Sequence, residues 1–128
     1  MSNFLTVAEV YRMQHTLIDR FGGLHGVRDK GAVDAAIFRP QIGYYSTIEE
    51  EGAVLMESLC NNHGFVDGNK RIAFAAADVF LRVNRFCLEV EGSEGDVFIT
   101  GSMERHEFRM PQILEWIRQH IKPLSGAK

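Results

Sequence analysis

The sequence predicts an all-α protein that folds as one compact helical bundle over residues 1–128. Apolar residues make up 45% of the chain and charged residues 24%, which is ordinary globular usage. Apolar positions recur at helical spacing, and no alternation typical of a strand persists long enough to build a sheet. A length of 128 residues fits a single domain with its own hydrophobic core.

The first helix is predicted from its two ends. Thr6 and Glu9 have the spacing of a capping box, in which each side chain accepts a hydrogen bond from the other residue's backbone. Apolar residues then follow at helical spacing as far as Phe21, and the glycine pair that begins at Gly22 should end the helix. A glycine-containing loop is expected next, as far as about Val27.

The second and third helices are separated by a loop. A short helix should run over residues 29–38, because the residue before Pro40 is biased away from helical angles. Residues 41–46 are expected to be extended or looped. Thr47 and Glu50 have the spacing of a second capping box, which opens a helix that should end at the Asn-Asn pair of residues 61 and 62.

The remaining helices follow from apolar periodicity. The helix from Asn69 or Lys70 to Asn84 is apolar nearly all round, which is typical of the central, buried helix of a bundle. Residues 86–90 could form a short extended stretch, and helices are expected over 93–103 and 111–121. Pro111 suits the first position of the last one.

Composition excludes several classes of protein. The net charge of −3 gives no sign of a nucleic-acid-binding patch or of electrostatic attachment to a membrane. The longest apolar run, Ile72 to Leu81, is about half the length of a membrane span. Cys60 and Cys87 lack the spacing of a metal or disulfide framework, and no signal peptide is apparent. We therefore expect a cytoplasmic protein with reduced thiols.

One short motif indicates a binding site. Residues 63–71 read H-G-F-V-D-G-N-K-R and stand directly before the apolar helix. Asp67-Gly68 predicts a turn, with Asn69 as the natural N-cap. Lys70 and Arg71 then lie at the positive end of the helix dipole, where each exposed cation costs about 0.3–1 kcal/mol. A bound phosphate would make both cations favourable, because the unpaired N–H groups of a first helical turn also attract anions.

The other polar residues of the motif add chemistry to this anion site. Asp67 offers the hard oxygen ligand that Mg²⁺ prefers, and the imidazole of His63 can take up a proton near neutral pH. These are the parts that phosphoryl or nucleotidyl transfer requires. Phe65 is interpreted as a packing anchor for the loop. The alternative is that these residues have structural roles only. His63 would then complement the end of the preceding helix, Asp67 and Asn69 would be ordinary turn and cap residues, and Lys70 and Arg71 would be a solvated pair.

At this motif the chain resembles the Fic/Doc superfamily, and within it the death-on-curing (Doc) toxin family. The superfamily pattern is H-x-F-x-[D/E]-G-N-G-[R/K], and the Doc branch reads H-x-F-x-D-[G/A]-N-K-R. The chain matches the Doc version at every specified position, namely His63, Phe65, Asp67, Gly68, Asn69, Lys70 and Arg71. The resemblance extends over nearly the whole chain. Arg85 departs from it, because the family often has glycine there.

The resemblance implies a Fic fold, with the active-site loop placed before the central helix. It implies that His63 is the general base and that Asp67 positions Mg²⁺. Gly68 and the three residues that follow it would hold the phosphates of ATP. The segment of Ile42, Gly43, Tyr44 and Tyr45 would be the flap that aligns a target peptide by backbone contacts.

The resemblance also implies a function and two partners. Doc-like members transfer the γ-phosphate of ATP to a threonine of elongation factor Tu and halt translation, and a small antitoxin protein restrains them. Most Fic proteins instead transfer AMP to a hydroxyl side chain. Lys70 favours the Doc branch, because a bulky cation in the glycine position should crowd the pose that donates AMP. A non-catalytic binding module of the same fold is a further alternative.

Overall fold

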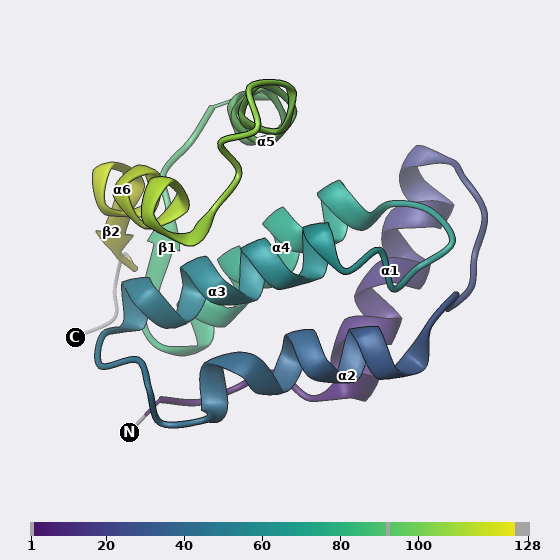
Figure 1. The fold of residues 1–128 in the computed structure, drawn as a ribbon, viewed down its shortest axis with the longest axis horizontal. Coiled ribbons are helices and arrows are strands. Elements are labelled where there is room, and N and C mark those ends of the chain that lie inside the picture. Colours follow the sequence, from purple (N-terminus) through teal and green to yellow (C-terminus); the bar gives the residue numbers. More distant parts are fainter. Residues whose placement is uncertain (1, 92, 125–128) are drawn as a thin grey trace.

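Six α-helices, one short 3₁₀ helix and two short strands form the fold in the residues that this computed structural model describes, 2–91 and 93–124 (Figure 1). In chain order these elements are α1 (Val7–Phe21), α2 (Lys30–Phe38), η1 (Arg39–Gln41), α3 (Ile48–Asn61), α4 (Asn69–Val83), β1 (Phe86–Leu88), α5 (Glu94–Glu104), α6 (Met110–His120) and β2 (Ile121–Pro123). The predicted all-α class is confirmed. None of the described helices is long and apolar enough to cross a membrane.

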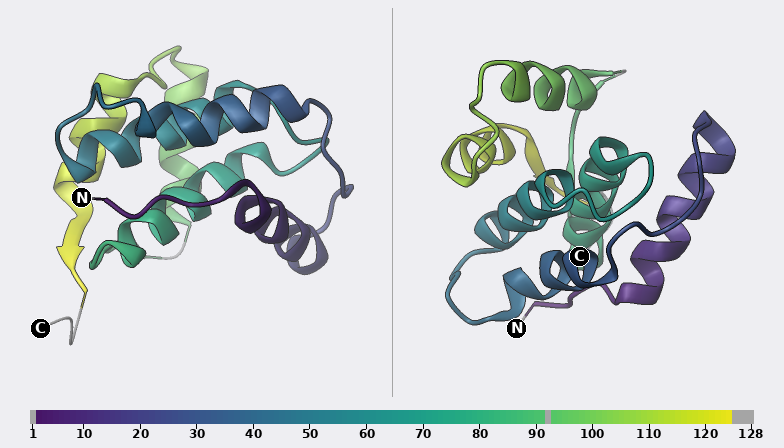
Figure 2. Two further views of the ribbon diagram at one scale, coloured as in Figure 1. Left: turned by 90° about the horizontal axis from the view of Figure 1, so that it is seen from below. Right: turned by 45° about the vertical axis from the view of Figure 1, so that its right-hand side comes forward.

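The core is built around α3 and α4, which lie side by side at the centre of the molecule (Figure 1). Every residue of α3 from Glu51 to Cys60 is buried. Helix α4 buries one broad face and shares the central position with α3. Its buried residues are Ile72, Ala73, Ala76, Ala77, Phe80 and Leu81. Figure 2 shows α1 and α2 on one side of this pair and α5 and α6 on the other.

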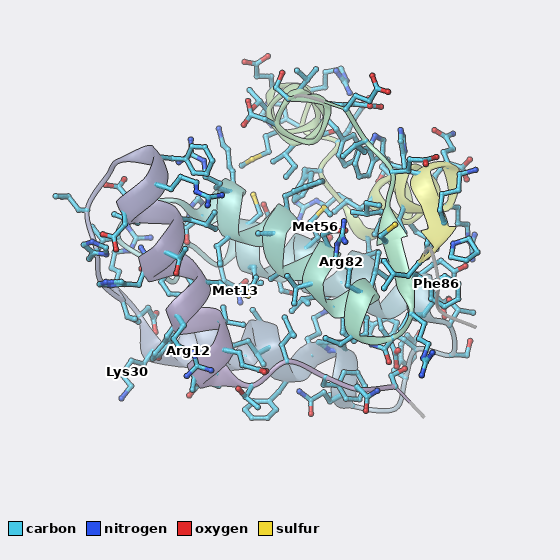
Figure 3. The ribbon with its side chains drawn as sticks, turned by 180° about the vertical axis from the view of Figure 1, so that it is seen from behind. Arg12, Met13, Lys30, Met56, Arg82 and Phe86 are labelled. Carbon is cyan, nitrogen blue, oxygen red and sulfur yellow. The ribbon has the colours of Figure 1, made fainter. Side chains whose placement is uncertain are left out.

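A small sheet corrects the expectation that no sheet forms. Strands β1 and β2 pair antiparallel, with Cys87 opposite Lys122. The carboxylate of Asp78 on α4 accepts a hydrogen bond from the Leu88 N–H at 3.0 Å, which ties this sheet to the central helix. Figure 3 shows Arg82 on α4 and Phe86 on β1 at this end of the helix. Strands of three residues are too short to produce a local pattern, and these two are far apart in the sequence.

The predicted helix starts are confirmed at α1, α3 and α4, but the expected N-cap of α4 is corrected. Both Thr-x-x-Glu pairs form reciprocal capping boxes, with backbone-to-hydroxyl distances of 3.1 Å at Thr6 and at Thr47. Helix α4 is capped by Gly68, and Asn69 is its first residue. The last helix begins at Met110, because the Glu57 carboxylate accepts a hydrogen bond from its N–H at 2.8 Å.

Candidate functional site

The motif forms the loop that joins the end of α3 to the start of α4. The side chain of Asn69 bonds to Phe65 in both directions: its oxygen accepts from the Phe65 N–H and its NH₂ donates to the Phe65 carbonyl, each at 3.0 Å. The Phe65 ring is buried and packs edge-on against Tyr11, with ring centroids 6.0 Å apart. The interpretation of Phe65 as the anchor of the loop is consistent with this burial, and Asn69 fixes the shape of the loop.

The segment that follows α1, residues 22–29, runs beside the motif loop. Val27 and Phe65 form an isolated antiparallel bridge. The bonds on either side of it run from the Arg28 and Asp29 N–H groups to the Gly64 carbonyl, at 2.8 and 3.0 Å, and from the Val66 N–H to the Gly26 carbonyl, at 3.0 Å. Backbone pairing with residues 26–29 therefore holds the motif loop in place at residues 64–66.

His63 is held by its backbone while its side chain stays exposed. Its φ of 51° lies in the left-handed region, which is uncommon for a residue with a side chain. The guanidinium of Arg28 donates two hydrogen bonds to the His63 carbonyl, at 2.9 and 3.2 Å. This grip fixes the turn at His63 and leaves the imidazole unconstrained by any hydrogen bond within the described residues.

Asp67 is fixed through both its backbone and its side chain. The buried amide of Gln14 donates to the Asp67 carbonyl at 3.2 Å. One carboxylate oxygen accepts a hydrogen bond from the Leu24 N–H at 2.8 Å. In the described part of the chain the second carboxylate oxygen has no hydrogen-bond partner, so it is available as a ligand for a cation.

The N-terminus of α4 is open. Gly68 has a φ of 80°, and among the described residues no side chain caps the first turn of the helix. A Cβ atom at this glycine would lie 3.3 Å from the side chain of Ile18, so strain and crowding both favour glycine there. Lys70 and Arg71 are exposed, and neither forms a salt bridge within residues 2–91 and 93–124. The Arg71 guanidinium lies 4.7 Å from the centre of the Phe21 ring.

A cavity of about 310 Å³ brings these groups together. Its lining residues are Cys60, His63, Val66, Asp67, Gly68, Asn69, Lys70, Arg71, Asp96 and Met103. Burial raises the pKa of the Cys60 thiol to about 11, and the charge of Lys70 opposes this rise. The thiol is therefore protonated at neutral pH and is a poor nucleophile. The cavity combines an imidazole, two carboxylates, two cations and an open helix N-terminus.

Comparison with known proteins places this site in a family. A sequence model of the Fic/DOC family matches residues 4–81, which contain the whole motif. The chain belongs to the Fic/DOC family. Two relatives carry Doc names: "Toxin Doc" of Mycolicibacterium smegmatis is 48% identical over 69 residues, and "Protein kinase doc" of Escherichia phage P1 is 35% identical over 80 residues.

These two matches are partial. They cover 50% and 59% of this chain, and 53% and 64% of the respective relatives. The chain thus spans less than two thirds of either relative. The Fic/DOC motif lies within the family match, whereas α5, which lines the cavity with Asp96 and Met103, lies outside it.

The structure does not bring the expected flap to the Fic/DOC motif. Residues Ile42 to Tyr45 precede the N-terminus of α3, whereas His63 follows its C-terminus (Figure 1). A helix of 14 residues is about 21 Å long, so its length separates the two segments. Ile42 and Tyr44 are strongly exposed, and the rings of Tyr44 and Tyr45 pack edge-on against each other. The segment that lies against the motif is residues 22–29 instead.

Sequence reasoning missed several residues of the Fic/DOC site. Asp96 and Met103 reach the cavity from α5, and nothing in the local pattern of that helix distinguishes them from surface residues. The Arg28 side chain contacts the His63 carbonyl, and the Leu24 N–H contacts the Asp67 carboxylate. The glycine-rich character of their segment was the available signal, because several left-handed glycines are typical of a chain that follows another closely.

Proposed function

We propose that this chain is a Doc-type toxin that transfers the γ-phosphate of ATP to a hydroxyl of a translation factor, such as a threonine of elongation factor Tu. The observation that carries the proposal is the open N-terminus of α4, whose two cations face the same cavity as His63. The names of the relatives, "Toxin Doc" and "Protein kinase doc", support it. The setting would be the bacterial cytoplasm.

The phosphates would bind where α4 begins. First-turn N–H groups and the dipole attract an anion, and Lys70 and Arg71 add charge-assisted hydrogen bonds. A second cavity, of about 470 Å³, adjoins this point and shares Lys70, Arg71 and Asp96 with the first. It is more apolar, with Phe21 and Phe74 in its lining, and would suit the nucleoside.

The transfer needs one proton acceptor. His63 would take the proton from the target hydroxyl as its oxygen attacks the γ-phosphorus. The bond from that phosphorus to the bridging oxygen then breaks, and ADP leaves with the electron pair. The hydrogen bonds from Arg28 to the His63 carbonyl fix the backbone turn that carries the imidazole.

The residues present also fit a magnesium ion. Asp67 lines the cavity, and the Leu24 N–H holds one of its carboxylate oxygens, so the orientation of the carboxylate is set before an ion binds. Bound Mg²⁺ would offset negative charge on the phosphates. Asp67 is the residue that would hold it.

The target peptide would be positioned by residues 22–29 and not by residues 42–45. In the pairing with Phe65, Val27 stands between the flanking hydrogen bonds, so its own N–H and C=O point away from the motif loop. Such an edge can bind an extended peptide through backbone hydrogen bonds. A small antitoxin protein is the second proposed partner, in keeping with the toxin name of the relative.

Labelled ATP tests the reaction. Purified protein is incubated with Mg²⁺, elongation factor Tu and ATP labelled at either the γ- or the α-phosphate. We expect the γ-label on the elongation factor. Transfer of the α-label would establish the alternative, AMP transfer, and transfer of neither label would refute both reactions for this target.

Growth assays test the non-catalytic alternative. We expect that expression of the chain arrests a bacterial host and that His63→Asn removes the arrest, because asparagine keeps the left-handed backbone but supplies no base. Equal arrest by both proteins would mean that binding of the chain to a host protein, and not the transfer reaction, stops growth.

A further inference from the structure

Three metal-ligating side chains meet on the surface where α1 passes into the segment of residues 22–29. His15 and Asp19 lie one turn apart on α1, and the chain reversal at Gly22-Gly23 brings His25 back to them. The Nε2 atom of His25 is 2.8 Å from one Asp19 oxygen, and the Nε2 atom of His15 is 3.4 Å from the other. The two imidazole rings stack with centroids 4.1 Å apart.

We propose that His15, Asp19 and His25 form a binding site for Zn²⁺. One ligand atom from each residue lies within 4.8 Å of the other two. Zinc bonds of about 2.0–2.2 Å in a tetrahedral arrangement place ligand atoms about 3.3 Å apart. The present nitrogen-to-oxygen distances are 2.8 and 3.4 Å, each to a different oxygen of Asp19, so small side-chain adjustments would complete the arrangement. Two imidazoles and one carboxylate favour zinc over Mg²⁺, which prefers oxygen ligands alone. All three side chains are exposed, so water can complete the coordination.

The two imidazoles share one carboxylate as their partner. Both imidazoles direct Nε2 at one carboxylate, so a single cation placed between them can reach all three groups. Zinc would require only that the two Nε2 atoms be deprotonated. The linear sequence conceals this arrangement, because His15 and Asp19 have helical spacing whereas His25 reaches them only through the turn.

An ion at this site would clamp the segment of residues 22–29 onto α1. His25 directly follows Leu24, whose N–H is bonded to the Asp67 carboxylate of the motif. A bound ion would therefore restrain the backbone next to Asp67 without touching any residue that lines the cavity. The site is independent of the proposed reaction.

Calorimetry with ZnCl₂ tests the site on the full chain, freed of affinity tags and of metal. We expect one Zn²⁺ per chain, with an affinity at least about tenfold weaker in His15→Ala and in His25→Ala, because even the loss of an outer-shell partner costs 10–100-fold. His106→Asn is the matched control, since it removes an exposed imidazole elsewhere and asparagine tolerates the left-handed φ of 59°. Unchanged affinity is expected for it.

Hydrogen exchange tests the clamp. Zinc should slow amide exchange over residues 22–26 in the unaltered chain and leave it unchanged in His15→Ala. The site is refuted if the chain binds no zinc at 100-fold molar excess, or if both alanine variants bind it as well as the unaltered chain. Zinc binding that depends on the two histidines but leaves exchange over residues 22–26 unchanged would overturn the clamp.

Discussion

The N-termini of the two central helices are built in opposite ways. At α3, the Thr47 hydroxyl accepts from the Glu50 N–H and the Glu50 carboxylate accepts from the Thr47 N–H, and the first turn carries three acidic residues. At α4 the cap is a glycine, no side chain in the described part of the protein caps the first turn, and the first charged residues are cations. The start of α3 is capped by its own side chains, and its acidic residues complement the helix dipole. The start of α4 has neither feature, so a bound anion could supply both. The start of α4 therefore has both unpaired N–H groups and positive charge with which to bind an anion.

The largest effect is expected on the rate of phosphate transfer, in a variant that leaves nucleotide binding at the N-terminus of α4 intact. His63→Asn should lower the rate of phosphate transfer by about 10²–10⁴-fold, the usual contribution of a general base. Nucleotide affinity should remain within about twofold of the unaltered chain, because the helix terminus and the two cations are intact. Rapid-mixing assays and calorimetry measure the two quantities. A similar fall in both would mean that His63 binds the nucleotide.

His63→Ala is the less suitable variant for this purpose. The residue has a φ of 51°, where alanine carries a backbone strain of roughly 1–2 kcal/mol. The alanine variant should therefore melt at a lower temperature than His63→Asn, although the exposed imidazole contributes little packing. Equal melting temperatures would show that the turn relaxes.

The two cations should determine nucleotide affinity. Lys70→Ala and Arg71→Ala should each weaken ATP binding by about 10–100-fold, since hydrogen bonds to charged groups contribute about 1.5–3 kcal/mol. Lys30→Ala is the matched control, because Lys30 is also an exposed residue in a first helical turn, but Asp29 already caps that helix at 3.0 Å. We expect unchanged affinity for the control. Calorimetric titration distinguishes the variants, and an equal loss at Lys30 would indicate general charge attraction only.

The loop before α4 should depend on Asn69 for its stability. Asn69→Ala removes both bonds to the Phe65 backbone and leaves a buried N–H without its partner, which costs about 1–3 kcal/mol. Urea denaturation measures the change in the free energy of unfolding. Asn62→Ala, which removes a single exposed bond to the Ala32 carbonyl, should cost less than half as much. Comparable losses would contradict the bracing role of Asn69.

A substitution at the capped N-terminus of α3 should lower the stability of the fold and leave ATP binding unchanged. Thr47→Ala removes the hydroxyl that accepts from the Glu50 N–H at 3.1 Å, and the loss of an N-cap typically costs about 1 kcal/mol. ATP affinity should be unchanged, because the other end of α3 leads to the motif. A loss of affinity in this variant would indicate coupling along α3.

The sequence predicted the features that depend on near neighbours. Both capping boxes require residues only three positions apart, and the glycine, the asparagine and the cations of the motif are adjacent in the chain. These features were therefore accessible before any packing was known. The predicted N-cap of α4 was Asn69, one residue after the observed cap, Gly68. The Asn69 side chain bonds to the Phe65 backbone and does not cap the helix.

Features that depend on packing were not predictable in this way. The loops 22–29 and 41–46 are both short and turn-rich, and only the arrangement of α1, α2 and α3 determines which of them lies beside His63. The pairing of β1 with β2, the contribution of Asp96 to the cavity and the meeting of His25 with Asp19 likewise join residues that local patterns do not relate.

The smallest effect concerns acid and the capping box of α3. The hydrogen bonds from the backbone of Ser46 and Thr47 hold the pKa of Glu50 below its ordinary value of 4.5. The carboxylate therefore stabilises the fold above pH 4.5, and this contribution is lost as the pH falls through the lower pKa of the folded state. Glu50→Gln should unfold more readily than the unaltered chain at pH 7, and the difference should shrink at acidic pH. Because Gly68 caps α4 without a carboxylate, the stability difference of Lys70→Gln should change less between pH 7 and pH 3.5 than that of Glu50→Gln, as thermal unfolding at both pH values would establish.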